Sequence, residues 1–370
     1  MSLRNKNVLI ISPENWGINH VSKHHYALEL AKNNYVYYLN LPQKRDSNVG
    51  QVISESLHIV NYKSMFPGIN YIPFSVRKVF QRIQADQIQK TIQKKLDIVW
   101  SFDPYRFQYL PLFRSTLNIY HPVDIHDTPI EKNIVNSCHV IFGSSDKILE
   151  RFSYTNKPVL KVGHGLADHF LNPIIPIKSF IRRSKRLRVG LVGNLHYSYI
   201  DNNTLMKIIE INSHIDFYFI GPYEMSNLSR MRNNRLISLL RSMPNTFLLG
   251  SKSSKVLPSY FSGFDLFLIC YTGKKNISEL ANPHKILEYL STGKPIVSHY
   301  IDEYKSHRNI ICMVDDNKDL ADLFSHVINN LSKYNSPDIV KKRKTIAKNN
   351  TYKKQIEKIE KFLSNIANES

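Results

Sequence analysis

The chain has 370 residues, of which 42% are hydrophobic and 22% charged. This balance excludes a disordered chain, and the length favours two domains of about 150 to 200 residues each. Lys and Arg number 50 against 30 Asp and Glu, a net charge of +20 that favours an anionic partner such as a phosphate-bearing substrate, an anionic lipid surface or nucleic acid. No window holds the roughly 18 to 20 apolar residues of a spanning helix, and the first residues lack a signal-peptide pattern, so we expect a cytoplasmic protein.

The first half alternates short apolar runs with amphipathic stretches, which is the pattern of a parallel sheet with crossover helices. A helix is predicted over Val21–Lys32, between the first two strands. The predicted strands are Asn7–Ser12, Asn34–Leu41, Leu57–Tyr62, Leu96–Phe102, Leu117–Val123, His139–Ser144 and Pro158–Gly163. Together they predict one Rossmann-like domain over residues 1–172.

A second series follows a proline-containing, basic stretch whose composition suits a linker. Its predicted strands are Leu187–Val192, Asp216–Ile220, Thr246–Leu249, Asp265–Cys270, Pro295–His299 and Asn309–Val314. We therefore predict an α/β fold with two Rossmann-like, doubly wound domains, the second over residues 186–348, facing each other across a ligand cleft. Ile356, Ile359 and Leu363 recur at helical spacing, so residues 349–370 are predicted to form an amphipathic helix that packs back on the first domain.

The most informative segment runs from Leu280 to Val297. A loop leads through Asn-Pro into a helix, Gly293 ends the helix, and Lys-Pro opens a buried strand. A helix N-terminus offers free N–H groups and the positive end of the helix dipole, which suits a phosphate. Glu288 lies one turn inside, on the face it shares with Lys285, and the alternative to ligand binding is a surface ion pair between the two.

This segment resembles the donor-binding motif of retaining GT-B glycosyltransferases, especially the family 4-like, group 1 enzymes of bacterial capsule, teichuronic acid and O-antigen synthesis. The resemblance implies that Glu288 binds the ribose hydroxyls of a nucleotide-sugar and that the preceding loop lies over its sugar and diphosphate. The loop residues are Glu279, Leu280, Ala281, Asn282 and Pro283. Many relatives have two glutamates separated by seven residues, and here Glu279 stands one position off that spacing.

The resemblance covers nearly all of the second half. The run from Arg188 to Leu195 is similar to the family's opening of the C-terminal domain, where Gly193 lets the backbone approach the donor, and later stretches match around Gly221 and from Asn245 to Asp265. Many relatives carry Arg and Lys after the glycine turn to neutralise the diphosphate, so Lys285, Lys274, Lys275 or helix-terminal amides must replace them. The further candidates for the donor site are Asn194, His196, Pro222 and Tyr271.

The resemblance is weaker in the first half. His121 and Asp124 end a predicted strand, where α/β folds place ligands, and they are the candidate catalytic residues. The alternative is a strand end whose polar groups are satisfied within the fold. The candidates for acceptor binding are Trp16, Gly17, His20 and His164.

The resemblance implies a retaining enzyme that moves a sugar from a nucleotide-sugar to a glycan or lipid-linked acceptor in bacterial surface polysaccharide synthesis. No Asp-x-Asp triplet occurs in the sequence. We therefore expect no metal site and no cofactor besides the substrate, with helix N-termini and basic groups stabilising the leaving diphosphate.

Two other functions compete with this interpretation. A sugar-nucleotide 2-epimerase of the same architecture would need several carboxylates in the cleft, and the sequence is poor in them. A basic nucleic-acid-binding protein would explain the charge, but the basic residues are dispersed over both halves and no recognition motif occurs, so we expect no nucleic acid partner.

A helix predicted over Pro73–Lys95 combines positive charge with apolar residues near its start. Its basic residues are Arg77, Lys78, Arg82, Lys90, Lys94 and Lys95, and its first apolar residues are Phe74, Val76, Val79, Phe80 and Ile83. One interpretation is peripheral attachment to the anionic inner face of the plasma membrane. The other is a helix that packs its apolar side on its own sheet.

Overall fold

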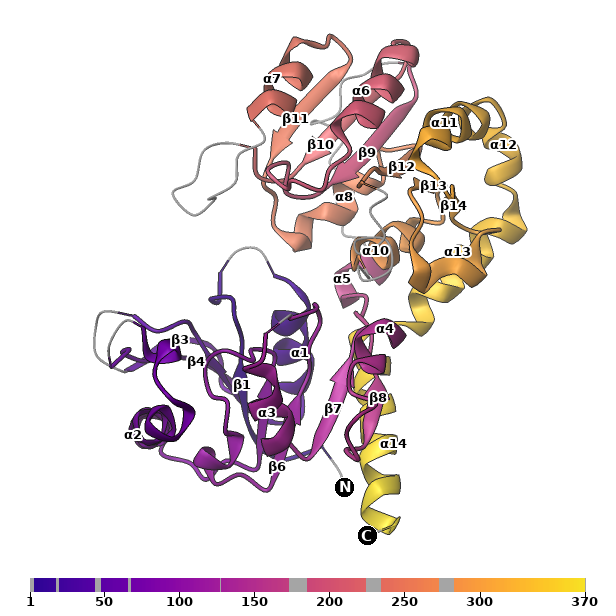
Figure 1. Ribbon diagram of the computed structural model, residues 1–370. Helices are drawn as coiled ribbons and strands as arrows, with labels where there is room; N and C mark the ends of the chain where they lie inside the picture. Colours follow the sequence, from indigo (N-terminus) through magenta and orange to yellow (C-terminus); the bar gives the residue numbers. More distant parts are fainter. Residues whose placement is uncertain are drawn as a thin grey trace. The chain divides into compact units, whose positions relative to one another are not determined.

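The computed structural model describes residues 3–17, 20–43, 48–65, 68–126, 128–172, 185–223, 234–272 and 283–369. The chain divides into two compact units: unit 1 holds Met1–Gly165 and Tyr352–Ser370, and unit 2 holds Leu166–Thr351. Each unit is a parallel-dominated sheet flanked by helices (Figure 1), which confirms the predicted α/β fold. The predicted linker lies largely outside the described residues.

Unit 1 is built on an eight-stranded sheet with the order β3-β4-β2-β1-β5-β6-β7-β8. The chain runs outward from β1 through β2 to β4 and then returns to the other side of β1, so the strand order reverses between β1 and β5. Its strands are β1 (Asn7–Ile11), β2 (Tyr35–Leu39), β3 (Asn48–Ser54), β4 (Leu57–Asn61), β5 (Ile98–Ser101), β6 (Leu117–Tyr120), β7 (Val140–Gly143) and β8 (Val159–Lys161). Its helices are α1 (Ser22–Leu30), α2 (Phe74–Ile92), α3 (Glu131–Ser137), α4 (Asp146–Glu150) and α14 (Tyr352–Glu369).

The edge strand β3 was not predicted from the sequence, and it pairs with β4 in the antiparallel sense, whereas the other pairs of this sheet are parallel. Gly50 interrupts its apolar residues and Val52 is 59% exposed, so the stretch lacks the run of buried residues that marks a parallel strand. A turn at Glu55 and Ser56 joins β3 directly to β4, as an antiparallel hairpin allows.

The C-terminal helix α14 packs on unit 1, although it follows unit 2 in the sequence (Figure 1, yellow). The Tyr352 hydroxyl lies 3.0 Å from the Ser22 hydroxyl of α1, and the rings of Phe362 and Phe142 are 6.4 Å apart. A Cβ on Gly165 would lie 2.5 Å from the Tyr352 nitrogen, so only glycine lets the two crossing segments approach this closely.

Unit 2 is built on a six-stranded, all-parallel sheet with the order β11-β10-β9-β12-β13-β14, which reverses between β9 and β12. Its strands are β9 (Arg188–Val192), β10 (Asp216–Ile220), β11 (Thr246–Gly250), β12 (Leu266–Ile269), β13 (Ile296–Ser298) and β14 (Cys312–Met313). Its helices are α5 (Asp168–Leu171), α6 (Asn202–Ile211), α7 (Asn234–Ser242), α8 (Leu257–Phe261), α10 (Lys285–Thr292), α11 (Leu320–Asn329), α12 (Leu331–Tyr334) and α13 (Pro337–Asn349). Cys138 of unit 1 and Cys270 and Cys312 of unit 2 are buried free thiols.

Candidate functional site

The switch point of the unit 2 sheet brings two of the sequence candidates together. Gly193 directly follows β9 and Tyr271 comes two residues after β12, and these two strands are neighbours in the sheet. The carboxyl ends of parallel strands lie at one edge, and a reversal of strand order opens a crevice there. The loop after β9 is also tied to the loop after β12, because the Thr272 N–H donates to the Tyr199 carbonyl over 2.7 Å.

Helix α10 presents its N-terminal turn at this edge. Its orientation is set from the buried side by Tyr289, whose ring stacks on Phe267 at 4.1 Å between centroids. The hydroxyl of Tyr289 accepts a hydrogen bond from the Val192 N–H at the end of β9, over 2.9 Å. Gly293 ends the helix at a φ of +79°, a conformation that glycine adopts without steric cost. The helix is thus fixed against β9 and β12, the two strands that flank the switch point.

Lys285, at the first turn of α10, reaches across to the loop after β9. Its ammonium donates to the Tyr271 hydroxyl over 3.1 Å, and a Cβ on Gly193 would lie only 2.8 Å from this nitrogen. Burial lowers the pKa of Lys285, but Tyr271, Tyr197 and Glu288 outweigh burial and bring it above the ordinary value. The missing side chain of Gly193 therefore lets a fixed positive charge approach the backbone of the loop after β9.

Glu288 lies one turn further along α10, with its side chain 12% exposed. Burial raises the pKa of this carboxyl to about 8, although Lys285 acts in the opposite direction. His284 lies 3.9 Å from the same carboxyl and has its side chain 36% exposed. At neutral pH the Glu288 carboxyl therefore holds a proton that a hydrogen-bonding or cationic neighbour could displace.

The remaining donor candidates lie in the loops after β9 and β10 at this edge of the sheet. Gly221, at a φ of +150°, packs its Cα against the Gly193 carbonyl, where a Cβ would lie 1.8 Å from the oxygen. The Leu195 N–H donates to the Pro222 carbonyl over 3.1 Å, and the Asn194 side chain accepts from the His196 N–H over 3.0 Å. The imidazole of His196 is buried. These residues hold the loops in place, and the two glycines allow the loops to touch through their backbones.

The loop candidates Glu279, Leu280, Ala281 and Asn282 lie outside the described residues, as do Lys274 and Lys275. Pro283 is described and lies two residues before the first residue of α10. The predicted role of this loop over the sugar and diphosphate stays a prediction.

Sequence reasoning named Tyr271 as a donor candidate but missed Tyr197 and Tyr199, two aromatic residues that lie near it. The rings of Tyr197 and Tyr199 stack at 4.7 Å, and Tyr199 meets Tyr271 edge to face at 5.2 Å. Tyr197 is 41% exposed. The two tyrosines follow the glycine turn at the place where Arg and Lys were expected, and that position was the available signal. His299, buried directly after β13, also contacts Tyr271, with ring centroids 5.3 Å apart.

In unit 1 the structure places His121 in the core, 0% exposed. Its Nδ1 accepts from the indole N–H of Trp100 over 3.3 Å, and its Nε2 lies 3.2 Å from the Val162 carbonyl. The ring also packs on Phe102 at 4.8 Å. Burial lowers the pKa of His121 to about 3, so the ring is neutral and both nitrogens are engaged within the unit. These contacts match the alternative of a strand end whose polar groups are satisfied within the fold. A catalytic role for His121 stays a prediction.

The other unit 1 candidates lie at the same edge of the sheet but in different surroundings. Asp124 is exposed in the loop after β6. Trp16 is half-buried, with its ring 5.0 Å from those of both His20 and Tyr38, while Gly17 is exposed. His164 is half-buried and makes a short contact with the Ser22 hydroxyl. Trp16 and His20 are thus in contact in the loop after β1, and His164 contacts Ser22 at the start of α1.

Within the described part of the chain, no group of three or more His, Cys, Asp or Glu side chains is placed to hold a metal ion.

No protein-family model matches the sequence, and no curated protein matches it. Solved structures match it over nearly the whole chain. Sucrose-phosphate synthase from Thermosynechococcus elongatus has a TM-score of 0.74 at 10% identity, with 99% of this chain and 100% of that chain covered. A glycosyltransferase from Rickettsia africae has a TM-score of 0.71 at 16% identity, with the same coverage. Anabaena HepE, solved in complex with UDP-glucose, has a TM-score of 0.68 at 12% identity, covering 98% and 100%. The chain therefore has the two-domain GT-B fold of glycosyltransferases.

Proposed function

We propose that the protein is a glycosyltransferase whose unit 2 binds a nucleotide-sugar donor at the edge formed by Gly193, Lys285 and Glu288. The observation that carries the proposal is the Lys285 ammonium held over Gly193 at the switch point of the sheet. It is supported by the full-length likeness to GT-B structures, one of which was solved with UDP-glucose.

The chemistry of sugar transfer suits this arrangement. The bond from the sugar C1 to the diphosphate oxygen breaks through an oxocarbenium-like transition state, and negative charge builds on the leaving diphosphate. A fixed ammonium and the N-terminal amides of α10 stabilise that charge more than they stabilise the ground state. We assign charge stabilisation to Lys285 and ribose binding to Glu288, and we name no protein nucleophile.

Nucleotide binding to the Glu288→Ala variant tests the site. Loss of one or more hydrogen bonds to a charged carboxylate should weaken UDP binding by about 1.5 to 3 kcal/mol in calorimetry. The matched control is Glu210→Ala, an exposed glutamate of α6, which should bind UDP like the wild type. Unchanged UDP affinity in a folded Glu288→Ala protein would refute the assignment.

The raised pKa of Glu288 gives the same assignment a second signature. Because ribose hydroxyls donate to the ionised carboxylate, binding must displace the proton that the empty site holds below about pH 8. UDP affinity should therefore rise as the pH increases from 6 to 8, with proton release, and Glu288→Gln should remove this dependence. Proton uptake on binding would contradict the proposed role.

We further propose that the transfer is metal-independent and retains the configuration at C1. Lys285 and the start of α10 already supply positive charge where a divalent ion would act. Activity should survive EDTA, and the product should keep the donor's anomeric configuration by NMR. Complete loss in EDTA with recovery in Mn²⁺ or Mg²⁺ would contradict the first statement, and inversion the second.

The acceptor in our proposal is a glycan or lipid-linked saccharide of bacterial surface polysaccharide synthesis, bound through unit 1 by the surface of Trp16, Gly17 and His20 and by His164. The experiment is incubation with UDP-hexoses in the presence and absence of a polyprenyl-linked acceptor. Consumption of the donor only with acceptor is the expected result. Epimerised donor without any acceptor would instead identify a 2-epimerase.

We also propose that unit 1 attaches peripherally to the inner face of the plasma membrane through α2. Among the described residues no helix is both long and apolar enough to cross a bilayer. Val76, Val79 and Ile83 of α2 are 48%, 59% and 41% exposed, and Tyr71 just before it is 94% exposed. Isolated exposed apolar residues are ordinary, whereas a stripe beside cationic residues suits an anionic leaflet.

The burial of individual α2 residues decides which variants test the membrane proposal. Arg77 is buried, and its guanidinium donates to the Gln108 side chain over 2.9 Å and to the Ile72 carbonyl over 2.8 Å, so it cannot contribute to a charged face. The informative variant is Val79→Ser with Ile83→Ser, and the control is Gln87→Ser on the same helix. Sedimentation with anionic vesicles should fall only in the double variant. Equal partitioning onto neutral and anionic vesicles would remove the proposal.

A further inference from the structure

Unit 2 contains a second cavity, at the other end of α10 from the candidate donor site. It has a volume of about 520 Å³, which is within the range of small-molecule sites. It is lined by Phe170, Leu171, Pro258, Phe261, Ser262, Ser291, Thr292, Lys294, Lys344, Ala347 and Lys348. Ser291 lies six residues after Lys285 on α10, a rise of about 9 Å, so one helix supplies both places with different residues.

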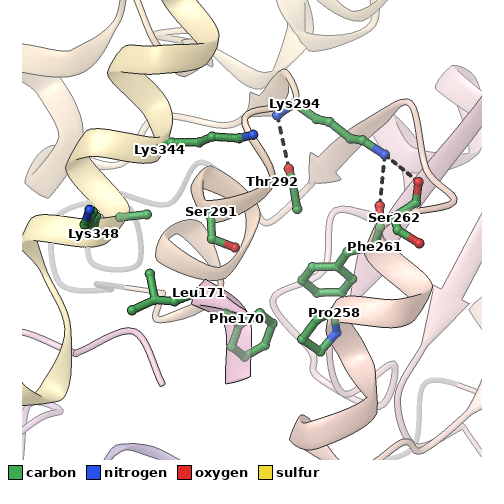
Figure 2. Close-up of a pocket in the computed structure, with 11 residues that line it drawn as sticks. Phe170, Leu171, Pro258, Phe261, Ser262, Ser291, Thr292, Lys294, Lys344 and Lys348 are labelled. Carbon is green, nitrogen blue, oxygen red and sulfur yellow. Dashed lines mark hydrogen bonds between the residues drawn. The ribbon is translucent and has the colours of Figure 1, made fainter. Parts of the chain in front are cut away.

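The lining divides into a cationic side and an apolar side. Figure 2 shows Lys294, Lys344 and Lys348 around one part of the cavity and Phe170, Leu171, Pro258 and Phe261 along another. None of the eleven described lining residues is acidic. Three like charges around a partly apolar cavity repel one another unless an anion is present.

Among the described side chains of the lining, two of the lysines are the available hydrogen-bond donors, since the Ser262 hydroxyl donates to the Ser259 carbonyl. The Lys294 ammonium uses its three N–H groups on the carbonyls of Phe261, Ser262 and Phe264, the first two at 3.0 Å (Figure 2). Burial lowers the pKa of Lys294 to about 8. The hydroxyls of Ser291 and Thr292 donate to the carbonyls of Glu288 and Tyr289 within α10. Lys294 therefore contributes charge, while direct bonds to a ligand fall to Lys344 and Lys348.

Lys344 is exposed but its stem is held in place. A Cβ on Gly293 would lie 2.9 Å from Lys344 Cε and 2.7 Å from Val340 Cγ1, so the stem lies directly on the glycine that ends α10. Lys348 follows one turn later on α13, at the spacing that puts both ammonium groups on one helix face. Two ammonium groups on neighbouring turns match a dianion better than a single carboxylate.

We propose that this cavity binds a phosphate monoester of an apolar alcohol, with the phosphate on Lys344 and Lys348 and the apolar chain against Phe170, Leu171 and Phe261. The site is distinct from the donor site and does not rest on the proposed function. Octyl phosphate, kept below its micellar concentration, is the probe, with inorganic phosphate and octanoate as partial ligands.

Calorimetry on the full chain tests the proposal. Octyl phosphate should bind at least about tenfold more tightly than inorganic phosphate or octanoate, because only octyl phosphate offers both the dianion and the apolar chain. Lys344→Gln with Lys348→Gln should weaken octyl phosphate about tenfold. The matched control is Lys341→Gln with Lys342→Gln, the same charge change on the same helix outside the cavity, which should bind like the wild type. Leu171→Ser should weaken octyl phosphate and leave inorganic phosphate unchanged.

The proposal would be overturned if both lysine double variants lost the same affinity for octyl phosphate, or if inorganic phosphate and octyl phosphate bound equally well. Displacement of octyl phosphate by UDP would also overturn it. UDP binding, measured on every variant, should stay at the wild-type value. The UDP measurement also separates the two proposals. If octyl phosphate does not bind while UDP binds normally, only the proposal for this cavity is overturned.

Discussion

Both sheets place ionisable side chains at their carboxyl-end edges, but the two edges treat them in opposite ways. In unit 1, His121 follows β6 and its ring packs on Phe102. The Trp100 indole N–H and the Val162 carbonyl lie within hydrogen-bond distance of its two nitrogens. In unit 2, Lys285 and Glu288 come from the first turn of a helix, with the Lys285 ammonium over Gly193, and both stay partly accessible.

The difference shows that position at a strand end is not enough to make a functional group. A residue on the strand itself is surrounded by its neighbours in the sheet and by the helices that cover it. Lys285, on the first turn of a helix, comes from outside the sheet, and Gly193 lets its ammonium approach the backbone at the strand end. The following predictions test this contrast, from the largest expected effect to the smallest.

His121→Ala should destabilise unit 1 by about 3 to 4 kcal/mol, since it opens a cavity and leaves the Trp100 N–H and Val162 carbonyl without their buried partner. Both tryptophans, Trp16 and Trp100, belong to unit 1, so urea unfolding followed by their fluorescence reports this unit. The control is Asp124→Ala, three residues later and exposed, which should change stability by less than about 0.5 kcal/mol. If the urea midpoint of His121→Ala equalled that of the wild type, the ring of His121 would not be a packing group of unit 1.

Lys285→Met should lower kcat/KM about 100-fold with a UDP-sugar donor, because the variant keeps the aliphatic stem and loses only the charge on the leaving diphosphate. Lys305→Met, at a lysine whose side chain is 64% exposed, is the control and should retain wild-type kinetics. Equal turnover by wild type and Lys285→Met would show that the ammonium is only a packing group.

Glu288→Gln should stabilise unit 2 at alkaline pH by at least about 1.4 kcal/mol, the equivalent of one pKa unit, and have no effect at pH 4.5. The folded pKa of about 8 lies above the ordinary value of 4.5, so the stability associated with the protonated carboxyl is complete below pH 4.5 and is lost as the pH rises through 8. Gln cannot ionise and avoids this loss. Hydrogen exchange in α10 at pH 5 and pH 9 measures it, and equal protection of both proteins at pH 9 would contradict the buried carboxyl.

Unit 1 should show the opposite pH dependence, with a loss of about 1 to 2 kcal/mol between pH 7 and pH 5. Burial lowers the pKa of His121 to about 3 and that of His24 to about 4, against an ordinary 6.5. The stability that these neutral rings contribute is present above pH 6.5 and is lost as the pH falls towards the folded values. The urea midpoint by tryptophan fluorescence should therefore drop over this range, and a constant midpoint would show that the rings protonate freely in the folded state.

The amino-acid sequence alone was sufficient for the strands, the tandem α/β organisation and the helix that carries Lys285 and Glu288. These features follow from local patterns: buried strands are continuous apolar runs, and a glycine after a helix marks its end. The hairpin strand β3 has no such run and was missed. Lys285 and Glu288 came from a motif of about eighteen residues whose spacing is also local, whereas the candidates around Gly193 and Gly221 came from other stretches that resemble the same family.

Only the tertiary structure decided which of the candidates are accessible. Nothing in the residues around His121 indicates that Trp100 and Val162, 21 and 41 positions away, occupy its nitrogens. Likewise, the contact of Lys285 with Gly193 and Tyr271, and of Lys344 with Gly293, joins segments whose approach depends on how helices pack on a sheet. Hydrophobic periodicity is set by neighbours in the chain, whereas the burial and charge of a site are set by neighbours in space.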